Sequence, residues 1–215
     1  MALKIEKFVC NMFQENCYVV SDDSLECVII DCGALYPEER SAISTYIKEN
    51  KLTPKHLLCT HAHIDHNFGD NFIHNEYDLQ PEVCIADKKL MKGLRWQAKA
   101  FVGMNYEEDI PPVGKFFSAG ETIVFGTHKF DIIGTPGHSP GSVVLYCADE
   151  NVAFTGDTLF RMSIGRTDLE DGRFDDIIAS LRSLAERLPA DTVVLPGHGP
   201  KTTIDEEVKY NPYFK

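Results

Sequence analysis

The 215-residue sequence lacks several features that define other classes of protein. It contains no apolar run near the roughly 20 residues that span a bilayer, so we expect no membrane-spanning helix. Its first residues form no continuous apolar core followed by small residues, which argues against a cleaved signal peptide. We find no repeat, low-complexity tract or Gly/Ser linker, and the length suits one large domain or two small ones.

Positive charge is also scarce, since the sequence has 21 Lys and Arg residues but 33 Asp and Glu residues. The formal net charge is therefore −12 at pH 7. Such an acidic surface repels phosphate backbones and anionic membranes. We expect neither nucleic acid nor a membrane as a partner.

The seven cysteines form no motif of two cysteines separated by two residues, which makes a thiolate zinc site improbable. Most of them lie in apolar, strand-like segments. This pattern is typical of buried free thiols in a reducing compartment, so we expect a cytoplasmic protein without disulfides.

The hydrophobic pattern predicts a chain in which strands and helices alternate. We expect strands at 3–9, 16–21, 26–31, 55–60, 83–86, 121–125, 128–135, 142–148, 152–156 and 192–195. We expect helices at 37–51, near 67–76, near 87–100 and at 174–188. A possible capping box of Thr203 and Glu206 predicts a short helix in the tail. This order indicates a mixed α/β domain with helices outside the sheets.

Five of the eight histidines lie in three loops that follow expected strands. The loops are HAHIDH (61–66), GTPGHSPG (134–141) and LPGHG (195–199), and the segment FTGDT (154–158) adds a carboxylate. A strand-like turn points His61 and His63 to the same side, and Asp65 continues that side. His66 needs a tight local turn, which could aim it at a second metal.

These side chains are too many for one metal. A metal ion takes about four ligands, and a catalytic site leaves one position open. A lone histidine at a strand end is usually a hydrogen-bonding loop residue, and Asp157 alone could be a turn residue or a helix cap. The dense HAHIDH cluster nevertheless favours two divalent metals, with zinc expected and iron or manganese as alternatives. The seven candidate ligands are His61, His63, Asp65, His66, His138, Asp157 and His198.

The segments HAHIDH, GTPGHSPGS, FTGDTLF and LPGHGP together resemble the metallo-β-lactamase superfamily, from about Phe13 to the C-terminus. Within it, GDTLF followed by SIGRTDL, and the ending GPKTTIDEEVKYNP, are similar to the short glyoxalase II-like hydrolases. The resemblance implies a single domain over residues 1–215. It also implies a four-layer αββα sandwich, in which two mixed sheets are flanked by helices.

The resemblance further implies a role for each candidate residue. Asp157 would bridge the two metals, and Asp31 would support the site from behind. The first metal would be held by His61, His63 and His138, and the second by Asp65, His66 and His198.

We expect hydrolysis of a small anionic thioester of the hydroxyacyl-glutathione type, by a hydroxide that bridges the metals. Bound metals lower the pKa of water toward about 7, and thiolates leave readily. Asp65 and Asp157 are the expected catalytic residues. Arg166 and Arg161 could bind a substrate carboxylate, although surface salt bridges would explain them equally well.

Other functions stay open at this point. A mononuclear iron persulfide dioxygenase would use His61, His138 and Asp157. A lactonase would need an apolar pocket, which residues 94–106 could line, although such a stretch is more often core or a lid helix. The absent export signal and His66 disfavour a β-lactamase, and the charge disfavours an RNA phosphodiesterase. A non-catalytic metal-binding module is a further alternative, and the sequence leaves the oligomeric state open.

Overall fold

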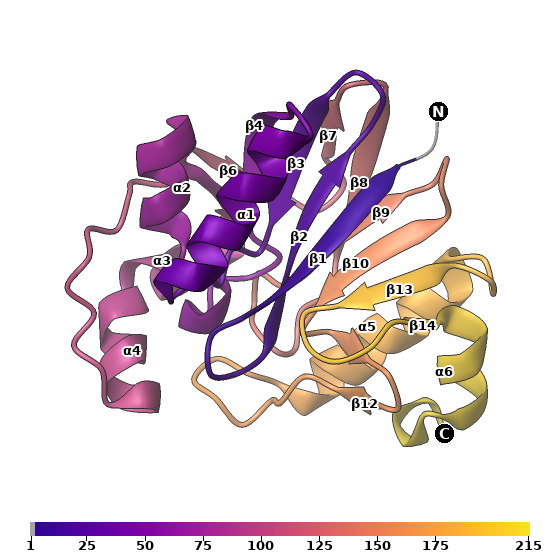
Figure 1. The fold of residues 1–215 in the computed structure, drawn as a ribbon. Coiled ribbons are helices and arrows are strands. Elements are labelled where there is room, and N and C mark those ends of the chain that lie inside the picture. Colours follow the sequence, from indigo (N-terminus) through magenta and orange to yellow (C-terminus); the bar gives the residue numbers. More distant parts are fainter. Residues whose placement is uncertain (1–2) are drawn as a thin grey trace.

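A computed structural model describes residues 3–215 and contains two six-stranded sheets that pack face to face (Figure 1). The first sheet is antiparallel from β1 to β3 and parallel from β3 to β6. Its strands, in spatial order, are β1 (Lys4–Cys10), β2 (Glu15–Ser21), β3 (Glu26–Ile30), β4 (Thr53–Leu58), β5 (Pro81–Cys84) and β6 (Lys115–Phe117).

The second sheet is antiparallel except where β10 pairs with β13. Its strands, in spatial order, are β14 (Thr202–Thr203), β13 (Val193–Pro196), β10 (Val152–Gly156), β9 (Val143–Cys147), β8 (His128–Gly134) and β7 (Thr122–Phe125). A separate two-stranded ribbon joins β11 (Leu159–Phe160) to β12 (Ser163–Ile164).

Helices cover the outer faces of both sheets (Figure 1). On the first sheet lie α1 (Pro37–Glu49) and α2 (Asp70–Tyr77), and on the second lie α5 (Phe174–Arg187) and α6 (Ile204–Tyr210). Beside the first sheet, α3 (Lys88–Lys92) and α4 (Leu94–Val102) pack on η1 (Ile64–His66), one of three 3₁₀ turns within residues 3–215. The others are η2 (Ile85–Asp87) and η3 (Pro212–Phe214).

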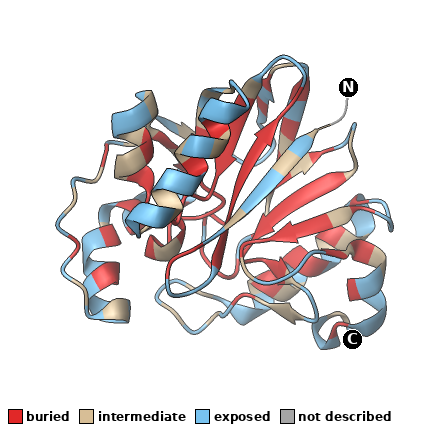
Figure 2. Cartoon of the chain, viewed as in Figure 1, coloured by how far each residue is buried: buried red, intermediate tan, exposed pale blue. Residues whose placement is uncertain are grey.

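The core between the sheets follows from the alternation of side chains along each strand. In β2, Tyr18 and Val20 point into the core between the sheets, whereas Cys17 and Val19 point toward α1 and α2. Both faces of β2 are therefore buried, as the central buried band in Figure 2 shows. The four-layer αββα sandwich that the family resemblance implies is confirmed.

Most of the predicted elements are present, with differences at the shortest ones. The helix expected near 87–100 is interrupted at Gly93, which separates α3 from α4. The strands β6, β11, β12 and β14 were not predicted, because two or three residues are too few to show an alternating pattern. Thr203 caps α6 as expected, since its side chain accepts a hydrogen bond from the backbone N–H of Glu206. Within residues 3–215, no helix is long and apolar enough to cross a membrane.

Candidate metal centre

The seven candidate ligands meet at one edge of the sandwich, because each loop that carries them follows the end of a strand. HAHIDH follows β4, and the loops of His138, Asp157 and His198 follow β8, β10 and β13. The tight turn expected at His66 is the 3₁₀ turn η1. Before His138, Gly137 has a φ of 139° and lies so close to Ile177 that a Cβ would collide with the backbone there, so the turn requires glycine.

One group of candidate ligand atoms consists of three buried imidazole nitrogens. His138 Nε2 lies 2.8 Å from His63 Nδ1 and 3.2 Å from His61 Nε2. Burial and the neighbouring His138 lower the pKa of His63 to about 3. Burial, reinforced by the nearby imidazoles, also lowers the pKa of His61 well below its usual range. Both rings are therefore held in the neutral form that binds metals.

A second group contains Asp65, His66 and His198. Asp65 Oδ2 lies 3.3 Å from His198 Nε2 and 3.7 Å from His66 Nε2. Burial lowers the pKa of His66, but the carboxylates of Asp157, Asp65 and Asp31 outweigh that effect and raise it well above the usual histidine range. These carboxylates therefore create a negative electrostatic potential that favours a positive charge at this place.

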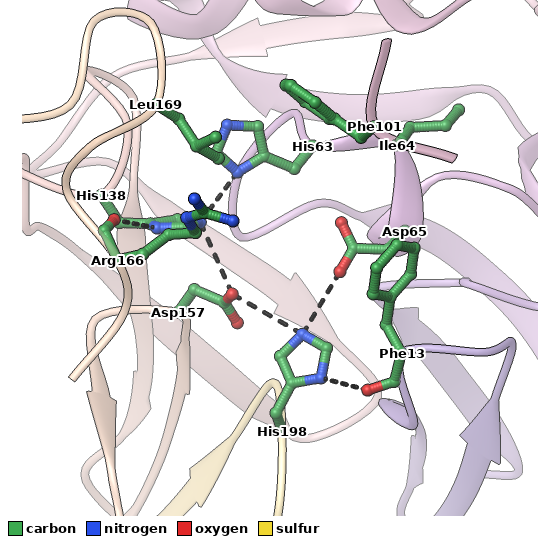
Figure 3. Close-up of a pocket in the computed structure, with 10 residues that line it drawn as sticks. All are labelled: Phe13, His63, Ile64, Asp65, Phe101, His138, Asp157, Arg166, Leu169 and His198. Atoms are coloured by element: carbon green, nitrogen blue, oxygen red, sulfur yellow. Dashed lines mark hydrogen bonds and ion pairs between the residues drawn. The ribbon is translucent and has the colours of Figure 1, made fainter. Parts of the chain in front are cut away.

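Asp157 lies between the two groups (Figure 3). Its Oδ2 is 3.5 Å from His138 Nε2 and 3.6 Å from His198 Nε2, and its Oδ1 is 3.3 Å from His66 Nε2. One carboxylate thus faces nitrogens of both groups, which is the placement expected of a bridging ligand.

The chemistry of this cluster fits divalent metal ions. His66 Nε2 and Asp157 Oδ1 are buried and have no hydrogen-bond partner in the part of the chain that the structure describes. His138 Nε2 lies within hydrogen-bonding distance of both His63 Nδ1 and His61 Nε2, and a cation between these nitrogens would bind a lone pair of each. Such unsatisfied buried groups are expensive, and a cation would satisfy them.

The nitrogens that face away from the centre are anchored by the surrounding chain. His138 Nδ1 donates to the carbonyl oxygen of Arg166 at 2.7 Å, and His198 Nδ1 donates to that of Phe13 at 3.1 Å. These bonds fix the tautomers in which Nε2 faces the centre. Asp31 Oδ2 lies 3.1 Å from His66 Nδ1, and its predicted role in supporting the site stays a prediction.

The sequence analysis missed Asp87, a buried carboxylate at the end of η2. It accepts hydrogen bonds from Ala62 N at 2.9 Å, Ser139 Oγ at 2.7 Å and Gly141 N at 2.6 Å. Asp87 therefore joins the HAHIDH loop to the loop of His138. No local pattern marks it, because its partners are 25 to 54 residues away along the chain.

A cavity of about 510 Å³ opens over the cluster. Within the apolar segment 94–106, Phe101 lines this cavity, whereas Leu94 and Tyr106 are buried in the core. Arg166 also lines the cavity, and its guanidinium is held by Asp168 through two hydrogen bonds of 2.7 and 2.8 Å. Arg161 is exposed between β11 and β12, outside the lining, so the geometry gives its predicted substrate contact no support.

The fold and the cluster define a protein with an αββα sandwich and a His/Asp centre suited to divalent metals. The sequence profile of the metallo-β-lactamase superfamily matches residues 10–198, and the chain belongs to this superfamily. Its fold binds divalent metals, and its members include hydrolytic enzymes.

Individual relatives are similar along nearly the whole chain. The hydroxyacylglutathione hydrolase GloC of Haemophilus influenzae is 34% identical over 213 residues, which covers 99% of this chain and 98% of that protein. The crystal structure of the BLEG-1 B3 metallo-β-lactamase is 33% identical, with a TM-score of 0.86 and coverage of 99% and 100%. The crystal structure of TTHA1623 in a di-iron-bound form is 34% identical, with a TM-score of 0.85 and coverage of 97% and 99%.

Proposed function

We propose that this metallo-hydrolase is a thioesterase of the hydroxyacylglutathione hydrolase type. The observation that carries the proposal is Asp157, which lies between two groups of ligand atoms at the floor of a cavity. The similarity to GloC supports thioesters as the substrate class. The cavity volume is in the usual range for small-molecule sites, roughly 300–1,000 Å³.

We further propose that the centre holds two divalent ions, zinc in the first place, with iron or manganese as alternatives. When bound, such ions polarise the substrate carbonyl and lower the pKa of water. The proposed bridge is Asp157. The proposed ligands of one ion are His61, His63 and His138, and those of the other are Asp65, His66 and His198.

The other tasks fall to side chains of the cavity. Asp65 borders the cavity, so its carboxylate can accept a proton from the attacking water and orient it. Arg166 attracts an anionic part of the substrate, in competition with Asp168. The seven free cysteines fit a reducing compartment, and we propose the cytoplasm.

The proposal is tested by elemental analysis of the purified protein, followed by thiol release from a panel of thioesters that includes S-lactoylglutathione. We expect about two metal ions per chain, loss of activity with a chelator and recovery with added metal. If the metal-replete protein releases no thiol from any thioester, the proposal is wrong. One iron per chain with sulfite formation from glutathione persulfide would instead identify a dioxygenase. The panel includes a β-lactam, because of the similarity to BLEG-1.

Replacing Asp157 by asparagine tests the bridge directly. The amide removes a negative charge that faces three imidazoles, so we expect turnover and metal content to fall while the circular dichroism spectrum is retained. Replacement of an outer-shell partner typically costs 10–100-fold, so we expect a loss of about 100-fold or more. The matched control is Asp149→Asn, at an exposed acid between β9 and β10. Unchanged turnover in Asp157→Asn would contradict the bridging role.

A further inference from the structure

The wall of the cavity is divided into two chemically different sides (Figure 3). Arg166 lies on one side, close to His138. Phe13, Ile64 and Phe101 lie across the cavity from Arg166, and Leu169 lies above Arg166 on its own side; we define these four apolar residues as the apolar arc. Phe13 and Phe101 keep 42% and 41% of their surface exposed, so both present apolar surface for a ligand to cover.

The charges of the cavity determine where an anionic group of the substrate would lie. Asp65 and Asp157 lie at the floor, where the proposed metal ions would offset their negative charge. Arg166 is the cation among the described residues that line the cavity, and its pair with Asp168 is exposed on both sides, at 61% and 69%. Such an exposed pair is weak, so a substrate carboxylate can replace Asp168.

A thioester has two arms that leave its carbonyl carbon in different directions. If the anionic thiol arm lies toward Arg166, the acyl arm faces the apolar arc. A lactoyl group has only one methyl group to place there and leaves most of the arc in contact with water. Filling the arc with carbon would add binding free energy in proportion to the apolar area covered.

We infer that the preferred thioesters of this protein carry a bulky apolar acyl group, aromatic or branched aliphatic, that binds between Phe13, Phe101 and Leu169. This inference rests on the proposed thioesterase function and deepens it.

The apolar arc is held in place before any ligand binds. Phe13 N donates to Asn11 Oδ1 at 2.9 Å, and the ring of Phe101 packs edge-on against Trp96 at 5.8 Å. The loop of Leu169 is tied to α3, because Lys89 Nζ bonds to Glu170 Oε1 and Asp171 Oδ2, both at 2.8 Å. A preformed wall loses little conformational entropy when a ligand binds, so more of the free energy gained by covering apolar area contributes to the binding affinity.

The test compares S-mandeloylglutathione with S-lactoylglutathione, which share the thiol arm and the 2-hydroxy group and differ in a phenyl against a methyl group. We expect kcat/KM to be about tenfold or more higher for the mandeloyl thioester. Phe101→Ala and Phe13→Ala should move this ratio toward one. Tyr210→Ala, at an exposed aromatic on α6, is the matched control and should leave the ratio unchanged.

A binding measurement separates recognition from turnover. S-benzylglutathione and S-ethylglutathione are unreactive thioethers that also differ in a phenyl against a methyl group, and calorimetry on the protein with and without metal gives their Kd values. The single tryptophan, Trp96, touches Phe101 and adds a fluorescence signal from the arc. We expect the benzyl compound to bind about tenfold tighter, with the difference reduced in Phe101→Ala.

The possible failures are distinguishable. Hydrolysis of neither thioester overturns the proposed function and the inference that rests on it. Hydrolysis of both with equal efficiency, or of the lactoyl thioester with the higher efficiency, overturns the inference alone. Equal Kd values for the two thioethers would also overturn it.

Discussion

Replacing Asp87 by alanine tests whether the metal centre depends on a buried carboxylate that touches none of the ligand atoms. The side chain accepts three hydrogen bonds, from Ala62, Ser139 and Gly141. In Asp87→Ala the backbone N–H groups of Ala62 and Gly141 lose their acceptor, whereas the Ser139 hydroxyl can donate to Ser142 Oγ, 2.8 Å away. Asp87 has no exposed surface, so water cannot easily take the place of its carboxylate. The two loops then lose the side chain that holds them together.

The magnitude follows from the number of unpaired donors. Each buried donor left without a partner costs about 1–3 kcal/mol. Two donors give a loss of about 2 kcal/mol or more, out of the ~5–15 kcal/mol that stabilises a typical domain. For a chain of this length, 1 kcal/mol corresponds to about 2–4 °C, so Tm should fall by about 4–8 °C or more. Metal affinity should fall about 10–100-fold, as for other outer-shell partners.

Thermal unfolding and titration against a competing chelator measure the two effects. Asp87→Asn keeps the volume and one acceptor oxygen, so we expect a smaller loss of Tm and a folded protein whose metal affinity can be determined. Asp109→Ala is the control, because the Asp109 side chain is 98% exposed. If both Tm and metal affinity of Asp87→Ala equal those of the unchanged protein, the reasoning is refuted.

Three other predictions concern pH, charge and metal. The hydrogen bond to Glu82 raises the pKa of His56, so this pair stabilises the fold fully below about pH 6.5 and less and less as the pH rises through the raised pKa. In His56→Gln, the free energy of unfolding in urea should therefore fall less over this pH range than in the unchanged protein. Asp168→Ala frees Arg166 and should lower KM for anionic thioesters in steady-state kinetics. An unchanged KM would contradict this role of Arg166. Removing metal with a chelator should lower Tm, and a Tm that stays the same would contradict metal binding to the folded state.

The sequence predicts the parts of the centre in which several potential metal ligands lie close together or directly follow a strand. HAHIDH carries four potential ligands in six residues, and the remaining three follow strands whose apolar runs are easy to recognise. Because the ends of those strands meet at one edge of the sandwich, the seven side chains converge. That residues 1–215 form a single domain stays a prediction.

The remaining features depend on contacts between distant residues, which local patterns do not contain. Asp87 and Gln97 look like ordinary helix-end and helix-surface residues, yet Gln97 Oε1 accepts from Ile64 N at 3.0 Å. Arg161 and Arg166 are equally basic and only a few residues apart. The hairpin of β11 and β12 places one outside the cavity and the other along its wall, and only the fold distinguishes them.

The candidate ligands are shared between the two layers of strands. Four come from the loop after β4 in the first sheet, and three come from loops of the second sheet. An ion bound by both sets would cross-link the halves of the sandwich from the outside, in addition to the apolar contacts between them. The supply of metal would then govern how long each molecule survives heat and proteases, as well as how fast it works.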